Sequence, residues 1–231
     1  MIRAVFFDLD NTLYSELDYV HSGFRAAAEF LSDKVNKEAE EIYMVMVDTF
    51  REHGRNAVFN RTLEKYNMLS DTLVMTLLYI YRSHRPELYL DSEVPQVIRE
   101  LHEWRYSVGI ITDGVGIVQH NKVAALGLED MADCIIYTDE LGPGRSKPSS
   151  APYKVALDLL GVISGDACYV GDDLSKDFVA PAKLGMRSVH LTKHRAVAFP
   201  CGSKVTRGAD WSLTPLRGLP QLLLAGDSRS H

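Results

Sequence analysis

VFFDLDNT, residues 5–12, changes character after its third residue. The first three residues are strand formers in a short apolar run, and Asp8 then begins a polar loop that also contains Asp10. This pattern predicts a buried strand that ends in two carboxylates. A short and wholly apolar strand is typical of a sheet that is covered on both faces.

Alternation of strand and helix patterns continues only after Pro86. Four further strands are expected at residues 107–112, 134–137, 167–170 and 188–191. Helical patterns lie beside them, at residues 93–104, 119–126, 152–160 and 178–184. Three of these helices are followed by glycines that are typical of C-caps, Gly127, Gly161 and Gly185. Repeated βα units predict an α/β fold, a doubly wound parallel sheet with helices on both faces.

Residues 15 to 85 interrupt this alternation with apolar residues at helical spacing and no strand pattern. We expect three or four helices there, with a helix start at Ser70 and a stop at Arg85-Pro86. Five aromatic residues are interpreted as bundle core rather than as a platform for stacking bases: Phe50, Phe59, Tyr66, Tyr79 and Tyr81. The expected domains are therefore an α/β core, residues 1–14 and 92–231, and an inserted helical bundle, residues 15–91.

The composition favours a soluble protein of the cytoplasm. The 231 residues carry a net charge of −6, whereas nucleic-acid binding usually needs a basic stripe. Three cysteines without CxxC spacing fit a reducing compartment better than a disulfide or zinc framework. No apolar stretch reaches the roughly 18–20 residues of a membrane span, and the N-terminus does not resemble a signal peptide. We expect a cytoplasmic protein with no nucleic-acid or membrane partner.

Polar residues follow the carboxyl ends of the expected strands, where doubly wound sheets bind their ligands. They are, in chain order, Asp8, Asp10, Thr112, Asp113, Lys147, Asp172, Asp173 and Asp177. Taken one at a time, these are ordinary turn, cap or surface residues. Together they predict one site that holds several carboxylates, a lysine and a hydroxyl.

This set of groups indicates phosphoryl chemistry. Crowded carboxylates repel one another unless a cation joins them, and ligands that are all oxygen suit Mg²⁺. A lysine, a hydroxyl and loop amides bind phosphate oxygens. An aspartate nucleophile can form an aspartyl-phosphate, and a second acid two residues on can protonate the leaving group and later activate water.

The order of these motifs resembles that of the haloacid dehalogenase superfamily. The matching segments are DLDNT at 8–12, Thr112, Lys147-Pro148 and the acidic run at 171–177. By this resemblance the α/β core is similar to the superfamily's Rossmann-like domain, and the helical block to its helical-bundle (C1-type) cap. Two details depart from the family pattern: Asp113 stands where asparagine is frequent, and Pro148 is not followed by a second proline.

The resemblance implies a role for each matching residue. Asp8 is the nucleophile, and Asp10 is the general acid and then the base, which implies a raised pKa for Asp10 in the first step. The phosphoryl group is held by Thr112, the backbone amide of Asp113, and Lys147. The Mg²⁺ ligands are Asp8, the backbone carbonyl of Asp10, and Asp172, with Asp173 and Asp177 assisting in the metal shell.

The implied activity is that of a Mg²⁺-dependent phosphomonoesterase that acts on a small phosphorylated metabolite, a nucleotide or a sugar phosphate, through an aspartyl-phosphate. We expect the protein to be a monomer or a homodimer. A phosphomutase shares the whole core and stays open as an alternative. A 2-haloacid dehalogenase is disfavoured because a halide leaves without a proton, and those enzymes typically lack the acid at the position of Asp10. A receiver-type signalling module is much shorter, and a non-catalytic phosphate binder has no need of the Asp8–Asp10 pair.

Overall fold

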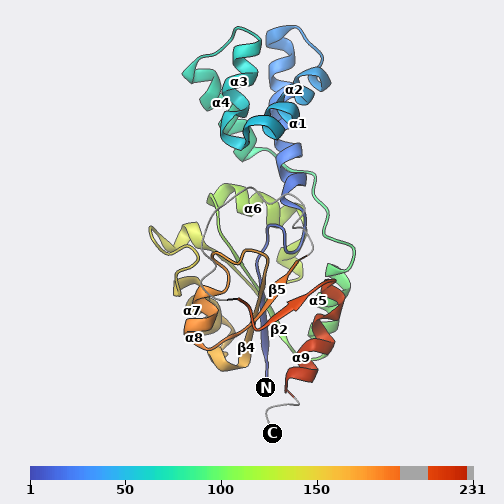
Figure 1. The fold of residues 1–231 in the computed structure, drawn as a ribbon, viewed down its shortest axis with the longest axis vertical. Coiled ribbons are helices and arrows are strands. Elements are labelled where there is room, and N and C mark those ends of the chain that lie inside the picture. The colour runs from blue at the N-terminus through green and yellow to red at the C-terminus, as the bar shows by residue number, and fades with distance from the viewer. Residues whose placement is uncertain (193–207, 228–231) are drawn as a thin grey trace. The chain divides into compact units, whose positions relative to one another are not determined.

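The computed structural model of the protein describes residues 1–192 and 208–227, which divide into two compact units (Figure 1). One unit combines Met1–Ser15 with Tyr89–His231, and the other is Glu16–Leu88. The sequence pattern predicts domain junctions after residues 14 and 91, and those domain bounds stay a prediction. In residues 1–192 and 208–227, no helix is both long and apolar enough to cross a membrane.

The first unit is built on a sheet of six strands with the order β3-β2-β1-β4-β5-β6. Every neighbouring pair is parallel. The strands are β1 (Ala4–Phe7), β2 (Ser107–Thr112), β3 (Cys134–Tyr137), β4 (Ala167–Gly171), β5 (Arg187–Leu191) and β6 (Trp211–Leu213). The predicted doubly wound α/β fold is confirmed. Among the strands of the described residues, the edge strand β6 alone has no counterpart among the expected strands.

Helices cover both faces of this sheet, as the repeated βα units predict. They are α5 (Val94–Glu103), α6 (Gly116–Ala125), α7 (Ala151–Leu160), α8 (Val179–Leu184) and α9 (Leu219–Asp227). Figure 1 shows α7 and α8 on one side of the strands and α5 and α9 on the other. Three chain reversals after helices use glycines in the left-handed region, Gly127, Gly161 and Gly185, as expected.

Strand register brings the motif residues to one edge of the sheet. β1 is the inner strand between β2 and β4, and Phe7 pairs with Ile110 on one side and Val170 on the other. All four residues of β1 are fully buried. Because the strands are parallel, the residues that follow β1, β2 and β4 emerge together at their carboxyl ends.

The second unit is a bundle of helices α1 (Glu16–Val35), α2 (Ala39–His53), α3 (Val58–Lys65) and α4 (Asp71–Ser83). Ser70 caps α4 by accepting a hydrogen bond from the backbone amide of Leu73 at 3.3 Å, as its position predicts. The helix ends at Ser83, just before the expected stop at Arg85-Pro86.

Aromatic rings form the centre of this bundle. The ring of Phe24 lies 5.8 Å from that of Phe50, 6.2 Å from Phe59 and 5.9 Å from Tyr81. The assignment of Tyr79 to the core is wrong, because this side chain is 70% exposed. Tyr79 precedes Tyr81 by two residues, and residues two apart point to different sides of a helix.

Candidate active site

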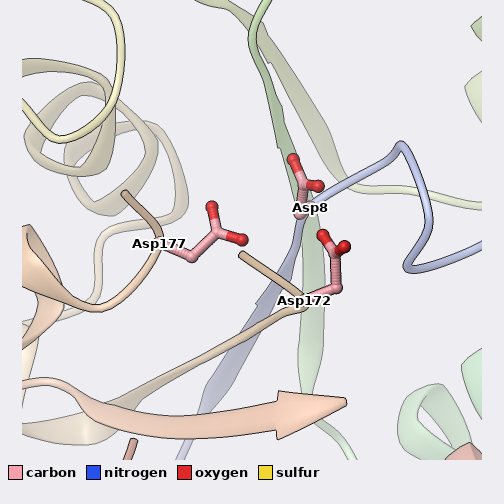
Figure 2. A group of neighbouring side chains, drawn as sticks. All are labelled: Asp8, Asp172 and Asp177. Atoms are coloured by element: carbon pink, nitrogen blue, oxygen red, sulfur yellow. The ribbon is translucent and has the colours of Figure 1, made fainter. Parts of the chain in front are cut away.

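Three carboxylates converge at the carboxyl edge of the sheet (Figure 2). Asp8 follows β1, Asp172 follows β4, and Asp177 lies in the loop before α8. One oxygen from each carboxylate lies within 4.8 Å of the other two. Asp8 and Asp177 are buried, and Asp172 is partly buried. The sequence motifs predict these three side chains in one site, and the fold brings them together.

Lys147 supplies a positive charge to this group from the loop after β3. Its Nζ donates hydrogen bonds to Asp8 Oδ1, to Asp177 Oδ1 at 2.9 Å and to the hydroxyl of Tyr169 at 3.0 Å. The side chains of Lys147 and Asp177 are fully buried. Burial lowers the pKa of Lys147, but the charges of Asp177 and Asp8 outweigh burial and raise it well above 10.5. The lysine is therefore a buried ammonium that pairs with the carboxylates.

The ammonium of Lys147, together with the charge of Lys176, which also lowers the pKa of Asp8 and Asp172, does not neutralise the three carboxylates. Burial, followed by the negative charges of Asp8 and Asp177, raises the pKa of Asp172 to about 8. The pKa of Asp8 rises to about 6, because burial outweighs the lowering effect of Lys147. Carboxyl groups that hold protons this strongly have room for a further positive charge. Their oxygen-only donor set fits a hard cation such as Mg²⁺.

Asp10 is held by a separate set of side chains. Lys122 Nζ lies 2.7 Å from Asp10 Oδ1 and 2.9 Å from Oδ2, Gln119 Nε2 donates to Oδ2 at 3.1 Å, and the hydroxyl of Tyr14 donates to Oδ1. Burial raises the pKa of Asp10, but the charge and hydrogen bond of Lys122, together with those from Tyr14 and Gln119, bring it below 3.8. This lowering is opposite in direction to the raised pKa expected for Asp10 in the first step, and that expectation, which concerns Asp10 beside a bound phosphoryl group, stays a prediction.

The sequence motifs do not predict the roles of Lys122, Gln119 and Tyr14. Lys122 and Gln119 are one turn apart on α6 and are only 3% and 1% exposed. Lysine is rarely buried unless it is paired, so a lysine on the apolar face of a helix is a usable signal. The expected helix began at Gln119, whereas α6 begins at Gly116, three residues earlier, and the first turn was not recognised.

Thr112 and Asp113 lie at the end of β2, where Thr112 contacts the set of side chains around Asp10 and Asp113 contacts the loop of Lys147. Thr112 is 1% exposed, and its Oγ1 accepts a hydrogen bond from Gln119 Nε2. Asp113 Oδ1 accepts hydrogen bonds from Thr138 Oγ1 at 2.7 Å and from the backbone amide of Lys147 at 3.1 Å. The Asp113 carboxylate thus ties the loop that carries Lys147 to the end of β2. Phosphate binding by Thr112, Asp113 and Lys147 stays a prediction.

Asp173 uses its carboxylate within its own loop. Its Oδ1 accepts hydrogen bonds from the backbone amide of Ser175 at 2.8 Å and from Ser175 Oγ at 2.5 Å. Its backbone amide donates to Asp177 Oδ2 at 3.0 Å. The group of three carboxylates includes neither Asp173 nor Asp10. Metal binding by Asp10 and Asp173 stays a prediction.

Comparison with known proteins agrees with this geometry. The family model for haloacid dehalogenase-like hydrolases matches residues 5–191. The chain is 30% identical over 203 residues to a glyceraldehyde 3-phosphate phosphatase from Methanocaldococcus jannaschii, covering 84% of this chain and 86% of the relative. It is 29% identical over 204 residues to a ribulose-1,5-bisphosphate 5-phosphatase from Halopiger xanaduensis, covering 82% and 84%.

A solved structure shares the fold. The 2-haloacid dehalogenase from Pseudomonas syringae superposes with a TM-score of 0.66 at 24% identity, covering 98% of this chain and all of that chain (100%). The family model spans more than half of the sequence, and a relative of 30% identity matches most of it. The chain therefore belongs to the haloacid dehalogenase-like hydrolases.

Proposed function

We propose that this protein is a Mg²⁺-dependent phosphomonoesterase that hydrolyses a small sugar phosphate through an aspartyl-phosphate on Asp8. The observation that carries the proposal is the buried contact between the Lys147 ammonium and the Asp8 carboxylate, with Asp172 alongside. Such a site suits an anionic substrate, because positive charge offsets its repulsion from the nucleophile. The names of two relatives, which act on glyceraldehyde 3-phosphate and ribulose-1,5-bisphosphate, support a sugar phosphate over a nucleotide.

Residues for Mg²⁺ are available in the same place. Asp8 and Asp172 would hold the ion, and Asp177, whose oxygens already contact Lys147 and the amide of Asp173, would assist them. When bound, the ion would neutralise charge at the nucleophile and polarise a phosphoryl oxygen.

The side chains of this protein would carry two chemical steps. In the first, an Asp8 oxygen bonds to phosphorus while the bond to the leaving oxygen breaks, and Asp10 protonates that oxygen. Lys147 and the Thr112 hydroxyl hold the phosphoryl oxygens. In the second, water bonds to phosphorus, its proton passes to Asp10, and the bond between phosphorus and Asp8 breaks. Inorganic phosphate then leaves and the Asp8 carboxylate is restored.

We assign the role of a cap to the helical unit, Glu16–Leu88, which would exclude bulk water and select the leaving group. A cytoplasmic location and a monomeric or dimeric state belong to the same proposal. The sparse cysteines support the location.

The test is hydrolysis of p-nitrophenyl phosphate with Mg²⁺ and with EDTA, by the wild type and by Asp8→Asn. We expect turnover that needs the metal and disappears in the variant. A panel of triose, pentose and hexose phosphates, followed by nucleotides, then identifies the substrate class by release of inorganic phosphate. Turnover that persists in Asp8→Asn would refute the aspartyl-phosphate. Isomerised sugar phosphate without phosphate release would show a phosphomutase instead.

A further inference from the structure

We propose that Lys122 is a positioning residue that holds the Asp10 carboxylate in place for hydrolysis of the aspartyl-phosphate. The inference rests on the proposed function and extends it to a residue outside the motifs. Lys122 lies on α6, and its contact with Asp10 joins positions 112 residues apart in the sequence.

The contact has the geometry of a clamp. Lys122 Nζ lies 2.7 Å from one carboxylate oxygen of Asp10 and 2.9 Å from the other, so it contacts both oxygens and restricts the orientation of the carboxylate. The lysine side chain is 4% exposed and that of Asp10 is 21% exposed. An exposed ion pair contributes little to stability, because water can take the place of either partner. Little water reaches the buried Lys122 ammonium, so its contact with Asp10 is not readily exchanged for one with water, and the contact keeps the carboxylate in one orientation.

Two further donors fix the same carboxylate. Gln119 Nε2 donates to Asp10 Oδ2 and also contacts Thr112 Oγ1, while the Tyr14 hydroxyl donates to Asp10 Oδ1. Lys122 is the member of this set that carries a positive charge and reaches both oxygens. Among the described residues, its removal would leave Asp10 with one neutral donor on each oxygen, so the carboxylate would be held less firmly about its side-chain torsions.

Orientation matters most in the second chemical step. There the Asp10 carboxylate must lie within hydrogen-bond reach of the attacking water while a proton passes to it. In the first step the need for Asp10 depends on the leaving group. Nitrophenolate leaves as a stable anion and needs no proton, so with p-nitrophenyl phosphate only the second step depends on Asp10.

The test is rapid-mixing kinetics of p-nitrophenyl phosphate with wild type and Lys122→Met. We expect the variant to release about one nitrophenolate per active site in a burst at the wild-type rate. The following steady rate should fall roughly tenfold to a hundredfold, which reaches only the lower end of the roughly 10²- to 10⁴-fold contribution of a general base itself, because the variant keeps Asp10. Lys122→Arg keeps a bidentate donor and should show a smaller fall. Lys154→Met, which removes an exposed lysine from α7, should behave as wild type.

A double-mutant cycle separates positioning from a merely structural role. Asp10→Asn should itself produce the burst with a slow steady rate, and adding Lys122→Met should change that rate less than twofold. The double variant also replaces the ion pair by two neutral residues, so it keeps the test valid where Lys122→Met alone folds poorly.

Three results would overturn the inference. They are a burst and steady rate that fall together, a further loss of steady rate when Lys122→Met is added to Asp10→Asn, and a rise in KM alone, which would assign Lys122 to substrate binding. A wild type that hydrolyses no phosphate monoester would refute the proposed function, and the inference with it, before any variant is compared.

Discussion

Replacement of Lys147 by methionine tests whether the buried charges at the sheet edge are coupled to folding. The substitution keeps an unbranched side chain that is one atom shorter and removes the ammonium. It leaves Asp8 and the fully buried Asp177 without their shared cation. It also removes the hydrogen bond that Lys147 Nζ donates to the Tyr169 hydroxyl at 3.0 Å. We expect the α/β unit to lose stability in the absence of divalent metal.

The size of the loss follows from burial. Removing one partner of a buried ion pair costs roughly 3–5 kcal/mol, because the other charge stays buried without compensation. Protonation of the uncompensated carboxylate sets an upper limit to this cost, because a protonated carboxyl group no longer carries a buried charge. Protonating a carboxyl group of ordinary pKa 3.8 at pH 7 requires about 4 kcal/mol. The same proton requires about 1.6 kcal/mol at pH 5. The loss should therefore be larger at pH 7 than at pH 5.

The assay is urea unfolding in EDTA, followed by tryptophan fluorescence at both pH values. Trp104 and Trp211 both lie in the α/β unit, so the signal reports on that unit alone. Lys154→Met should change stability by less than about 0.5 kcal/mol, as exposed substitutions usually do. Adding Asp177→Asn to Lys147→Met should recover part of the loss, because one of the two uncompensated carboxylates is then gone.

A loss below about 1 kcal/mol at pH 7 would refute this reasoning, because an uncompensated buried carboxylate costs more than that. An equal loss at pH 5 and pH 7 would refute it as well. In that case the effect of the substitution would come from packing, and the ion pair would not be its cause.

Three further expectations concern packing, metal and protonation. Gly171→Ala should lower the free energy of unfolding by about 1–3 kcal/mol and remove most of the activity, because the new Cβ would lie 2.4 Å from Asp177 Oδ2. In the control variant Gly165→Ala the new Cβ meets nothing within 4 Å, so this variant should behave as wild type in unfolding and turnover assays. MgCl₂ should raise the melting temperature more at pH 8 than at pH 6, because Mg²⁺ competes with protons for Asp172, whose pKa is about 8. An equal rise at both pH values would contradict binding of the ion by Asp172. Burial lowers the pKa of His84 and is only partly opposed by a backbone hydrogen bond, so protonation of His84 opposes folding and the stability of the protein should fall as the pH drops below 6.5. In thermal unfolding at pH 7.5 and 5.5, His84→Gln should reduce that fall in stability. An unchanged fall would contradict the assignment to His84.

Most of the fold could be predicted from local patterns. The expected strands at 107–112 and 134–137 have the bounds of β2, an inner strand, and β3, an edge strand, because both are short runs rich in strand-forming apolar residues. β6 could not be predicted in this way. It has three residues, and each is at least partly exposed, so its sequence carries no apolar run that distinguishes it from a loop.

The site divides along similar lines. Asp8, Asp172 and Lys147 could be placed together because each follows a strand, and the parallel arrangement gathers strand ends at one edge. Lys122 could not, because it lies in the middle of a helix, and only the rotation of α6 about its axis decides that its side chain reaches Asp10.

The sequence by itself determined the class of fold, the order of its elements and the residues at the strand ends, because these depend on burial patterns between near neighbours in the chain. Only the tertiary structure decided how the charges pair. It set Lys147 against Asp8 and Asp177, turned the Asp113 carboxylate toward the Lys147 loop, and held Asp10 with Lys122. Electrostatic contacts depend on distances of a few ångströms and on burial, and both are defined only when strands that are far apart in the sequence lie side by side.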